Sequence, residues 1–417
     1  MDKIRIRGGN RLSGEVTVSG AKNAALPILF SSLLTGETSK YERVPLLQDI
    51  QHTELILKGM GVETVKSGSS LSITPGNLKS HEAPYDLVRK MRASILVLGP
   101  LLARFGHAKV SLPGGCAIGA RPIDLHLKAM EKLGAEIELA EGYVIAKAKR
   151  LKGAKIIFEF PSVGATENVM MAAVLADGET RLENCAKEPE IVDLARALRT
   201  MGAKISGEGS EEILIHGVTS LHGAKHEIIG DRIEAGTYLM AAIATGGKVK
   251  INGIDPEFLF AVIEKCREVG AKVELGTSSI SIEMNGRPKA VDITTLPHPG
   301  FPTDMQAQFM AAMCVAEGSS VFTETIFENR FMHVPELIRL GADLSVRSNS
   351  VIVRGRDKLL GAPVMATDLR ASASLVIGGL CAEGTTTVSR IYHLDRGYEK
   401  MEAKLSALGG DIERIPE

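Results

Sequence analysis

The chain of 417 residues has no tryptophan, and aromatic residues make up only 4% of it. Proteins that bind single-stranded nucleic acid stack bases on aromatic side chains, so this composition supplies such a surface poorly. The formal net charge of −1 at pH 7 also provides no broad positive field for a nucleic-acid backbone. We therefore expect no nucleic-acid partner, and any anionic ligand must be held by a local group of cations.

Cysteine is scarce as well. The five cysteines include no C-x-x-C pair, and they are Cys116, Cys185, Cys266, Cys314 and Cys381. This number and spacing disfavour both a disulfide framework and a zinc site. We therefore predict no metal ion, and a reducing cytoplasm is the compartment that fits best.

Long apolar runs are absent from the sequence. No stretch reaches the roughly 18 apolar residues of a membrane span. The first residues, MDKIRIRGGNRLSG, lack the apolar centre of a signal peptide. We expect a cytoplasmic protein without a membrane span, and the length favours two or three domains.

A short sequence motif, here called the repeat phrase, recurs along the chain with a period of about 70 residues. Its six copies are MGVETV, LGAEIEL, MGAKIS, VGAKVEL, LGADLSV and LGGDIER, with glycines at Gly61, Gly134, Gly202, Gly270, Gly341 and Gly409. A near-constant period of this length indicates one supersecondary unit used six times.

The repeated unit combines two kinds of helix. The segment before each phrase, such as EIVDLARALRTMGA, has apolar residues three and four positions apart, which predicts a half-buried amphipathic helix. A second segment, such as ENVMMAAVLA, is apolar nearly all round and predicts a buried helix. Alternating runs such as ADLSVRSNSVIVRG predict a hairpin. The unit is therefore strand, buried helix, strand, amphipathic helix and hairpin.

Six such units divide most simply into three plus three, because the buried helices then fill two separate cores. We predict an α/β protein with one domain formed by residues 1–21 and 230–417, completed by the N-terminal strands. The second domain comprises residues 22–229 and carries a glycine-rich loop over residues 111–122. The cleft between two domains is the expected ligand site.

Charged or hydroxyl-bearing residues precede the otherwise apolar helices. Asp304, Ser162, Thr166 and Asp368 are residue types that cap helix N-termini, and capping alone is an adequate account of each. Lys22, Arg92 and Arg370 are different, because a cation at a helix N-terminus opposes the helix dipole unless an anion lies there. These cationic starts point to a bound anion.

Cys116 lies in the sequence LPGGCAIGARP, between glycines and close to Arg121. A thiol near a cation gains or loses a proton readily, and the glycines suit a lid. A lone loop cysteine is nevertheless more often inert than catalytic. Cys266, Cys314 and Cys381 fall on helical segments and are expected in the core, whereas Cys185 fits either interpretation.

Several long motifs carry a resemblance to a known family. LPGGCAIGARPIDLH, SGAKNAALP, KMRASILVLGPLLARFG, SVGATENVMMAA, HPGFPTDMQAQFMA, FENRFMH, ATDLRA and HLDRGYE occur in order from the first strand to the last repeat. On these motifs the chain resembles the UDP-N-acetylglucosamine 1-carboxyvinyltransferases, enolpyruvyl transferases of the EPSP synthase superfamily. The resemblance implies a two-domain inside-out α/β barrel of six repeats of about 70 residues, with buried helices within each domain.

The resemblance also implies the reaction and its substrates. The 3′-hydroxyl of UDP-N-acetylglucosamine would attack phosphoenolpyruvate, with loss of phosphate, as the first committed step of peptidoglycan synthesis. No cofactor is implied. Cys116 would protonate phosphoenolpyruvate and could bond to it covalently, and Asp304 would accept the sugar proton. Lys22, Arg121 and Arg396 would hold the phosphate and carboxylate, with support from Arg370.

The resemblance places the nucleotide sugar along a further set of residues. These are Asn23, Arg92, Arg121, Pro122, Ile123, Asp124, Leu125, Ser162, Val163, Gly164 and Ile326, with Arg330 and Asp368 completing the polar shell. One departure concerns the residues before SVGAT, where many members carry a cation. This chain has Glu159, Phe160 and Pro161 there, which puts the diphosphate contacts on that side in doubt.

Two alternatives stay open from the sequence. The sister enolpyruvyl transferase acting on shikimate 3-phosphate shares the repeats, but we expect it to lack the loop with Cys116. A non-enzymatic, ring-shaped binding protein would also be built from repeated units. It needs a basic inner surface, which the near-neutral charge does not favour.

Overall fold

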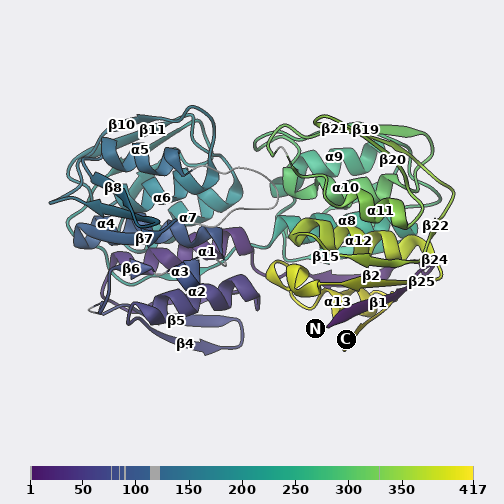
Figure 1. Ribbon diagram of the computed structural model, residues 1–417, viewed down its shortest axis with the longest axis horizontal. Helices are drawn as coiled ribbons and strands as arrows, with labels where there is room; N and C mark the ends of the chain where they lie inside the picture. Colours follow the sequence, from purple (N-terminus) through teal and green to yellow (C-terminus); the bar gives the residue numbers. More distant parts are fainter. Residues whose placement is uncertain are drawn as a thin grey trace. The chain divides into compact units, whose positions relative to one another are not determined.

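The computed structural model (Figure 1) describes residues 2–76, 78–83, 85–88, 91–112, 123–327 and 329–416. These residues form two compact units. Unit 1 contains the chain up to Ser19 and from Gly230 onward, and unit 2 contains the described residues between Gly20 and Ile229. The chain therefore leaves unit 1 after its first two strands, builds unit 2, and then returns.

Unit 2 has three nearly fully buried inner helices and an outer layer of amphipathic helices. The inner helices are α1 (Lys22–Ser31) with the 3-10 turn η1 (Ser32–Leu34), η2 (Arg92–Val97) with α4 (Leu98–Phe105), and α6 (Val163–Ala173). The outer helices are α2 (Gln48–Gly59), α3 (Tyr85–Val88), α5 (Asp124–Lys132) and α7 (Pro189–Thr200).

Three four-stranded sheets complete the described part of unit 2. Their strand orders are β14 (Lys225–Glu227), β3 (Ser39–Glu42), β5 (Ser70–Thr74), β4 (Glu63–Ser67); β6 (Glu82–Ala83), β7 (His107–Ser111), β9 (Tyr143–Lys147), β8 (Glu136–Ala140); and β10 (Lys155–Ile157), β11 (Glu179–Glu183), β13 (Glu212–His216), β12 (Lys204–Ser206). In each sheet the first pair is parallel and the other pairs are antiparallel.

Unit 1 repeats this plan. Its inner helices are α8 (Arg232–Thr245), η4 (Thr303–Met305) with α10 (Gln306–Met313), and α12 (Leu369–Cys381). Its outer helical segments are η3 (Pro256–Leu259) with α9 (Phe260–Glu268), α11 (Val334–Arg339), η5 (Ile391–Arg396) and α13 (Met401–Ala407). The three inner helices lie side by side in Figure 1.

The sheets of unit 1 include strands from both ends of the chain. The orders are β2 (Ser13–Thr17), β15 (Lys248–Asn252), β17 (Ser279–Glu283), β16 (Lys272–Leu275); β18 (Ile293–Thr294), β19 (Ser319–Thr323), β21 (Ser350–Arg354), β20 (Asp343–Arg347); β23 (Pro363–Met365), β25 (Thr385–Ser389), β1 (Lys3–Arg7), β26 (Asp411–Ile415); and the small pair β22 (Leu359–Leu360), β24 (Ala382–Glu383).

The first strands of the chain thus complete sheets that begin more than 200 residues later. β1 lies between two C-terminal strands, with Arg5 opposite Thr387 on one side and Glu413 on the other. β2 pairs in parallel with β15, so that Ser13 lies opposite Lys248. In unit 2, β14 closes the first sheet from the far end of that unit.

The six recurring glycines follow the amphipathic helices as the repeat predicts. Their φ angles lie between 86° and 99°, a left-handed conformation that glycine adopts without steric cost. One predicted helix differs from the expectation. The segment ASILVLGPLLARF begins as the 3-10 segment η2, and the α-helix starts only at Leu98, because Pro100 fits the first turn of an α-helix but not its interior.

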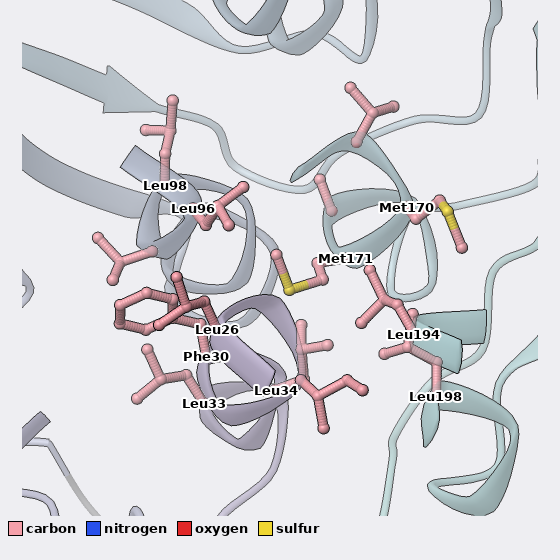
Figure 2. Close-up of a cluster of buried hydrophobic side chains, with 14 of the residues drawn as sticks. Leu26, Phe30, Leu33, Leu34, Leu96, Leu98, Met170, Met171, Leu194 and Leu198 are labelled. Atoms are coloured by element: carbon pink, nitrogen blue, oxygen red, sulfur yellow. The ribbon is translucent and has the colours of Figure 1, made fainter. Parts of the chain in front are cut away.

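The core of unit 2 is built where its inner helices meet (Figure 2). Phe30 of α1, Leu96 of η2 and Met171 of α6 point toward one another, and Leu194 of α7 closes the cluster from outside. Each of these side chains is buried. Burial of one such side chain contributes about 1.5–3 kcal/mol, so the helices are held by packing on all faces. Among the described residues, no helix combines the length and apolarity needed to cross a bilayer.

Candidate active site

Asp304 is the centre of a buried ion-pair cluster in unit 1. Its Oδ1 accepts a hydrogen bond from Arg330 Nη2 at 2.6 Å, and its Oδ2 accepts from Arg370 Nη2 at 3.0 Å and Nε at 3.2 Å. Burial alone raises the pKa of Asp304, but the two guanidinium groups hold it well below its ordinary value. The side chain of Asp304 is still 25% exposed, so an ionised carboxylate reaches the surface.

A second layer of hydrogen bonds fixes Arg330. Its Nη1 donates to Thr303 Oγ1 at 3.0 Å, and Thr303 donates to Glu324 Oε2 at 2.8 Å. The other oxygen of Glu324 accepts from Thr295 Oγ1 at 2.7 Å and from the backbone N–H of Ile326 at 2.8 Å. Glu324 therefore places the loop with Ile326 beside the Asp304 cluster, a role that the sequence did not reveal.

Asp368 caps the helix that carries Arg370. Its Oδ1 accepts from the backbone N–H groups of Arg370 at 2.8 Å and Ala371 at 3.0 Å. His333 is buried nearby, with a pKa of about 4, because burial and Arg330 lower it while Asp368 opposes the shift. This neutral histidine next to two candidate residues was missed, since a lone histidine in a sequence is indistinguishable from an ordinary core residue.

Arg396 ends η5 on the same unit and is half-buried. Its charge, after burial, is the main cause that lowers the pKa of His393, while Asp368 raises it. Arg396 and Asp368 therefore both lie near His393. The neighbouring Asp395 is held by Arg414 at 2.6 Å, which anchors the η5 segment to β26.

In unit 2, Lys22 starts helix α1 and is already neutralised in part. Its Nζ lies 3.0 Å from Asp49 Oδ2, and the two side chains are 11% and 2% exposed. Asn23 follows Lys22 and is half-buried. The cation at this helix start thus has an internal anion as partner, which the sequence pattern did not show.

Arg92, at the start of η2, lies close to His126 of α5. Burial and the positive charge of Arg92 lower the pKa of His126 to about 4. Asn168 Nδ2 lies 3.0 Å from His126 Nδ1 and donates to Ile95 O, also at 3.0 Å. A Cβ on Gly164 would lie 3.3 Å from His126 Cε1, so this glycine lets the start of α6 approach the imidazole closely.

The residues around these helix starts complete the polar end of unit 2. Ser162 caps α6 by accepting from the N–H of Ala165 at 3.4 Å, and Val163 and Gly164 form its first turn. Ile123 and Leu125 are buried at the start of α5, and Asp124 between them is exposed. Glu159 pairs with Lys128 at 3.1 Å on the surface, and Phe160 is exposed.

A buried acid lies among these helix starts. Glu167 of α6 is buried, and its pKa is raised well above the ordinary value by burial and by the charges of Glu190 and Glu188. The Oε1 atom of Glu167 has no hydrogen-bond partner among the described residues. Burial thus favours the protonated form of Glu167, and the apolar pattern around it gave no sign of this.

A cavity of about 530 Å³ marks the other end of the inner helices of unit 2. It is lined by residues at the C-terminal ends of all three, including Leu34, Phe105 and Leu175. Arg104 closes these ends by donating to the carbonyls of Leu33, Thr35 and Gly76 at 2.6–3.1 Å. Lys22, Arg92 and Ser162 stand at the other, N-terminal ends of these helices.

Two of the expected caps serve another purpose. Asp304 lies inside η4 and binds two arginines, and Thr166 lies inside α6, where its Oγ1 accepts from the N–H of Ala186 at 3.1 Å. Partners that are distant in the sequence outcompete the local backbone for these side chains. Ser162 and Asp368 do cap their helices.

The candidate residues Cys116, Arg121 and Pro122 lie outside the described residues. The other four cysteines are free thiols. Burial raises the pKa of Cys185 to about 11 and that of Cys381 to about 12, and it also raises those of Cys266 and Cys314. None of these four is therefore a reactive thiolate at neutral pH. Among the described residues, no cluster of three metal-ligating side chains occurs.

Comparisons with known proteins cover nearly the whole chain. A family model described as EPSP synthase (3-phosphoshikimate 1-carboxyvinyltransferase) matches residues 6–405. The chain is 58% identical over 417 residues to the UDP-N-acetylglucosamine 1-carboxyvinyltransferase of Enterobacter cloacae subsp. cloacae, covering 100% of this chain and 99% of that protein.

Solved structures agree on the fold. The enolpyruvyl transferase NikO from Streptomyces tendae matches with a TM-score of 0.89 at 26% identity, over 100% of this chain and 99% of that one. EPSP synthase from Acinetobacter baumannii matches with a TM-score of 0.76 at 21% identity over 100% of both chains, which shows the fold alone. The expected two-domain fold is thereby confirmed.

Proposed function

Because the chain belongs to the EPSP synthase family of carboxyvinyl transferases, we propose that it transfers the enolpyruvyl group of phosphoenolpyruvate to the 3′-hydroxyl of UDP-N-acetylglucosamine. The observation that carries this proposal is the 58% identity, over the full length, to an enzyme named for that reaction. The reaction would begin peptidoglycan synthesis in the cytoplasm. It would thereby contribute to cell-wall biogenesis and cell shape. It would also contribute to the cell cycle and cell division.

The proposed reaction is an addition followed by an elimination. The sugar oxygen forms a bond to C2 of phosphoenolpyruvate while C3 takes up a proton, which gives a tetrahedral intermediate. C3 then loses a proton and the C2–O bond to phosphate breaks, leaving an enolpyruvyl ether and inorganic phosphate. We assign the first proton to the Cys116 thiol. A covalent adduct forms when the sulfur, instead of the sugar oxygen, bonds to C2.

We assign the sugar proton to Asp304. Arg330 and Arg370 hold the pKa of Asp304 well below its ordinary value, so the carboxylate is ionised and can accept a proton. The same ion pairs make it a weak base. Proton transfer is therefore concerted with attack on C2, because the hydroxyl becomes acidic only as its oxygen bonds to carbon.

The cations of both units supply the electrostatic part of the proposal. Lys22, Arg121 and Arg396, with Arg370 in support, would hold the phosphate and carboxylate of phosphoenolpyruvate and stabilise the charge on the departing phosphate. Lys22 would then share its charge between the substrate and Asp49, its partner at 3.0 Å. The pairs with Asp49 and Asp304 keep Lys22 and Arg370 oriented before an anion binds.

The nucleotide sugar would lie along the polar end of unit 2. The proposed contacts are Asn23, Arg92, Arg121, Pro122, Ile123, Asp124, Leu125, Ser162, Val163, Gly164 and, from unit 1, Ile326, Arg330 and Asp368. The grouping of Arg92 and Gly164 around His126 supports this placement for two of them. Because Glu159 and Phe160 supply no cation, Arg92 carries more of the phosphate binding in this proposal.

Phosphate release tests the proposal directly. The protein is mixed with phosphoenolpyruvate and either UDP-N-acetylglucosamine or shikimate 3-phosphate, and inorganic phosphate is measured over time. We expect release only with the nucleotide sugar, together with an enolpyruvyl ether in the mass spectrum of the product. Release with shikimate 3-phosphate alone would assign the sister activity, and no release with either substrate would leave a binding protein.

A further inference from the structure

A buried polar network joins α8, α10 and the segment after η5 next to Asp304. The Nε2 of Gln308 on α10 lies 3.0 Å from the hydroxyl oxygen of Tyr398, 3.2 Å from Thr237 Oγ1 of α8 and 2.8 Å from the backbone oxygen of Asp304, and it shares its two hydrogens among these acceptors. Thr237 Oγ1 and the hydroxyl of Tyr398 are 2.9 Å apart. We call Thr237, Gln308 and Tyr398 the tyrosine network.

Counting donors fixes the direction of the hydrogen bond between Thr237 and Tyr398. Thr237 donates its only hydroxyl hydrogen to the carbonyl of Ile233 at 2.7 Å, so its oxygen can only accept from Tyr398. The oxygen of Tyr398 can then accept from Gln308, and the lone pairs of this oxygen point away from Thr237. The guanidinium of Arg370 lies 5.5 Å from the centre of the Tyr398 ring.

The network is closed to solvent. Thr237 and Gln308 are fully buried, and Tyr398 and Arg370 are 2% and 3% exposed. Hydrogen bonds in such surroundings are stronger than in water, and an unmatched partner is costly, so few other arrangements are available to these side chains. The guanidinium of Arg370 therefore lies between the ring of Tyr398, which the hydrogen bonds of its hydroxyl hold in place, and the carboxylate of Asp304, to which it donates.

We propose that Tyr398 is a positioning residue for the transfer reaction: through Arg370 it fixes the orientation of the Asp304 carboxylate. This inference rests on the proposed function. The electrostatics agree with the geometry, because burial lowers the pKa of Arg370 but Asp304 and then Tyr398 raise it above its ordinary value. The network also ties the segment that carries Arg396 to α8 and α10, since Tyr398 follows Arg396 by two residues.

Tyr398→Phe removes one hydroxyl and keeps the ring, and Tyr238→Phe is its matched control. Tyr238 is also fully buried in unit 1, on α8, but its hydroxyl donates to Glu234 at 3.3 Å. We expect Tyr398→Phe to lower kcat about tenfold, with KM for both substrates within about twofold, because small displacements of reacting groups reduce the rate strongly. We expect Tyr238→Phe to lower Tm by about as much as Tyr398→Phe does, because each variant loses one buried hydroxyl, but to leave kcat unchanged.

A double-mutant cycle shows whether Tyr398 acts through Arg370. In an Arg370→Lys background, Tyr398→Phe should change kcat less than about twofold, because the guanidinium that it positions is gone. Equal losses in both backgrounds, or identical kcat values for Tyr398→Phe and Tyr238→Phe, would overturn the inference. Thr237→Val removes the acceptor of the Tyr398 hydrogen, together with the contacts of the Thr237 hydroxyl to Gln308 and Ile233, and provides the same comparison if Tyr398→Phe does not fold.

The outcomes separate this inference from the proposed function. If the wild-type protein releases no phosphate with either acceptor substrate, the proposed function fails. If the wild-type protein is active and the two tyrosine variants behave alike, the proposed function stands and the positioning role of Tyr398 fails.

Discussion

At the scale of single residues, Asp304 is the counter-charge of two buried arginines. Asp304→Ala leaves Arg330 and Arg370 buried without their counter-charge, so we expect a loss of stability of about 3–5 kcal/mol. Turnover should fall by about 10²–10⁴-fold while UDP-N-acetylglucosamine still binds. Urea unfolding, titration calorimetry and phosphate release measure the three quantities.

Asp304→Asn is the control for Asp304→Ala, because its amide oxygen still accepts a hydrogen bond from one of the two arginines while the basic carboxylate is removed. It should lose turnover with a smaller loss of stability. Strong loss of nucleotide-sugar binding in both variants would instead make Asp304 an anchor for the substrate.

Cys116→Ala tests the proton donor. We expect turnover at neutral pH to fall by about 10²–10⁴-fold, because protonation of C3 then depends on water. Cys185→Ala is the matched control, since the Cys185 thiol is buried and its raised pKa of about 11 makes it unreactive. That variant should lose stability and keep turnover. Wild-type turnover in Cys116→Ala would contradict the assignment.

The lowered pKa values of His126 and His333 predict that the free energy of unfolding decreases at acid pH. Each has a pKa of about 4, against 6.5 for an ordinary histidine, mainly because burial lowers it. Between these values the unfolded chain binds more protons than the folded one, so stability falls as the pH falls from 6.5 to 4. Each histidine accounts for up to about 3 kcal/mol of this loss.

Urea unfolding at pH 7.5, 6 and 5 measures the effect of the two histidines. His126→Gln and His333→Gln cannot take up the proton, so each should flatten the decline in the free energy of unfolding. A decline as steep as that of the wild-type protein in both variants would show that other groups cause it.

At the scale of elements, a single capping side chain at a helix N-terminus contributes to the free energy of unfolding. Asp231 caps α8, and its Oδ1 accepts from the N–H groups of Ile233 at 2.8 Å and Glu234 at 2.9 Å. Asp231→Ala should cost about 1–2 kcal/mol in the free energy of unfolding. Asp255 caps the short η3 with one bond of 3.0 Å, so Asp255→Ala should cost less. Equal losses would show that capping is not the cause.

The same elements show what the sequence could predict. Periodicity indicated the buried α6 and the amphipathic α7, because those patterns depend only on neighbours within one helix. It could not indicate that Asp304 binds Arg330 and Arg370 rather than capping its helix, since that choice depends on residues 26 and 66 positions away. Glu167, His126 and Tyr398 stayed hidden for the same reason. Each looks like part of an ordinary helix or loop until its partners are known.

At the scale of the whole molecule, the two units differ in how they use the chain. The described part of unit 2 lies within one continuous stretch, closed by β14, whereas unit 1 needs β1 and β2 from the other end. We expect residues 20–229 alone to unfold cooperatively, because all three of their sheets are complete. Residues 230–417 alone should not, because β25 and β26 lose the strand between them.

Circular dichroism during thermal unfolding of the two fragments checks this difference. Adding a synthetic peptide of residues 1–19 to the second fragment should restore a cooperative transition. A cooperative transition of residues 230–417 without the peptide would show that β1 and β2 are dispensable for unit 1.

The place of β1 between β25 and β26 also governs the order of events at the ribosome. β1 pairs with strands that follow it by some 380 residues, so it is unpaired until those residues have been synthesised. Unit 2 can close during that time, and unit 1 can close only after β25 and β26 have emerged. In the sequence KIRIR, positively charged residues alternate with isoleucines, so that Arg5 and Arg7 lie on the face opposite Ile4 and Ile6. We expect these charges to keep the unpaired strand soluble and to discourage its association with strands of neighbouring nascent chains.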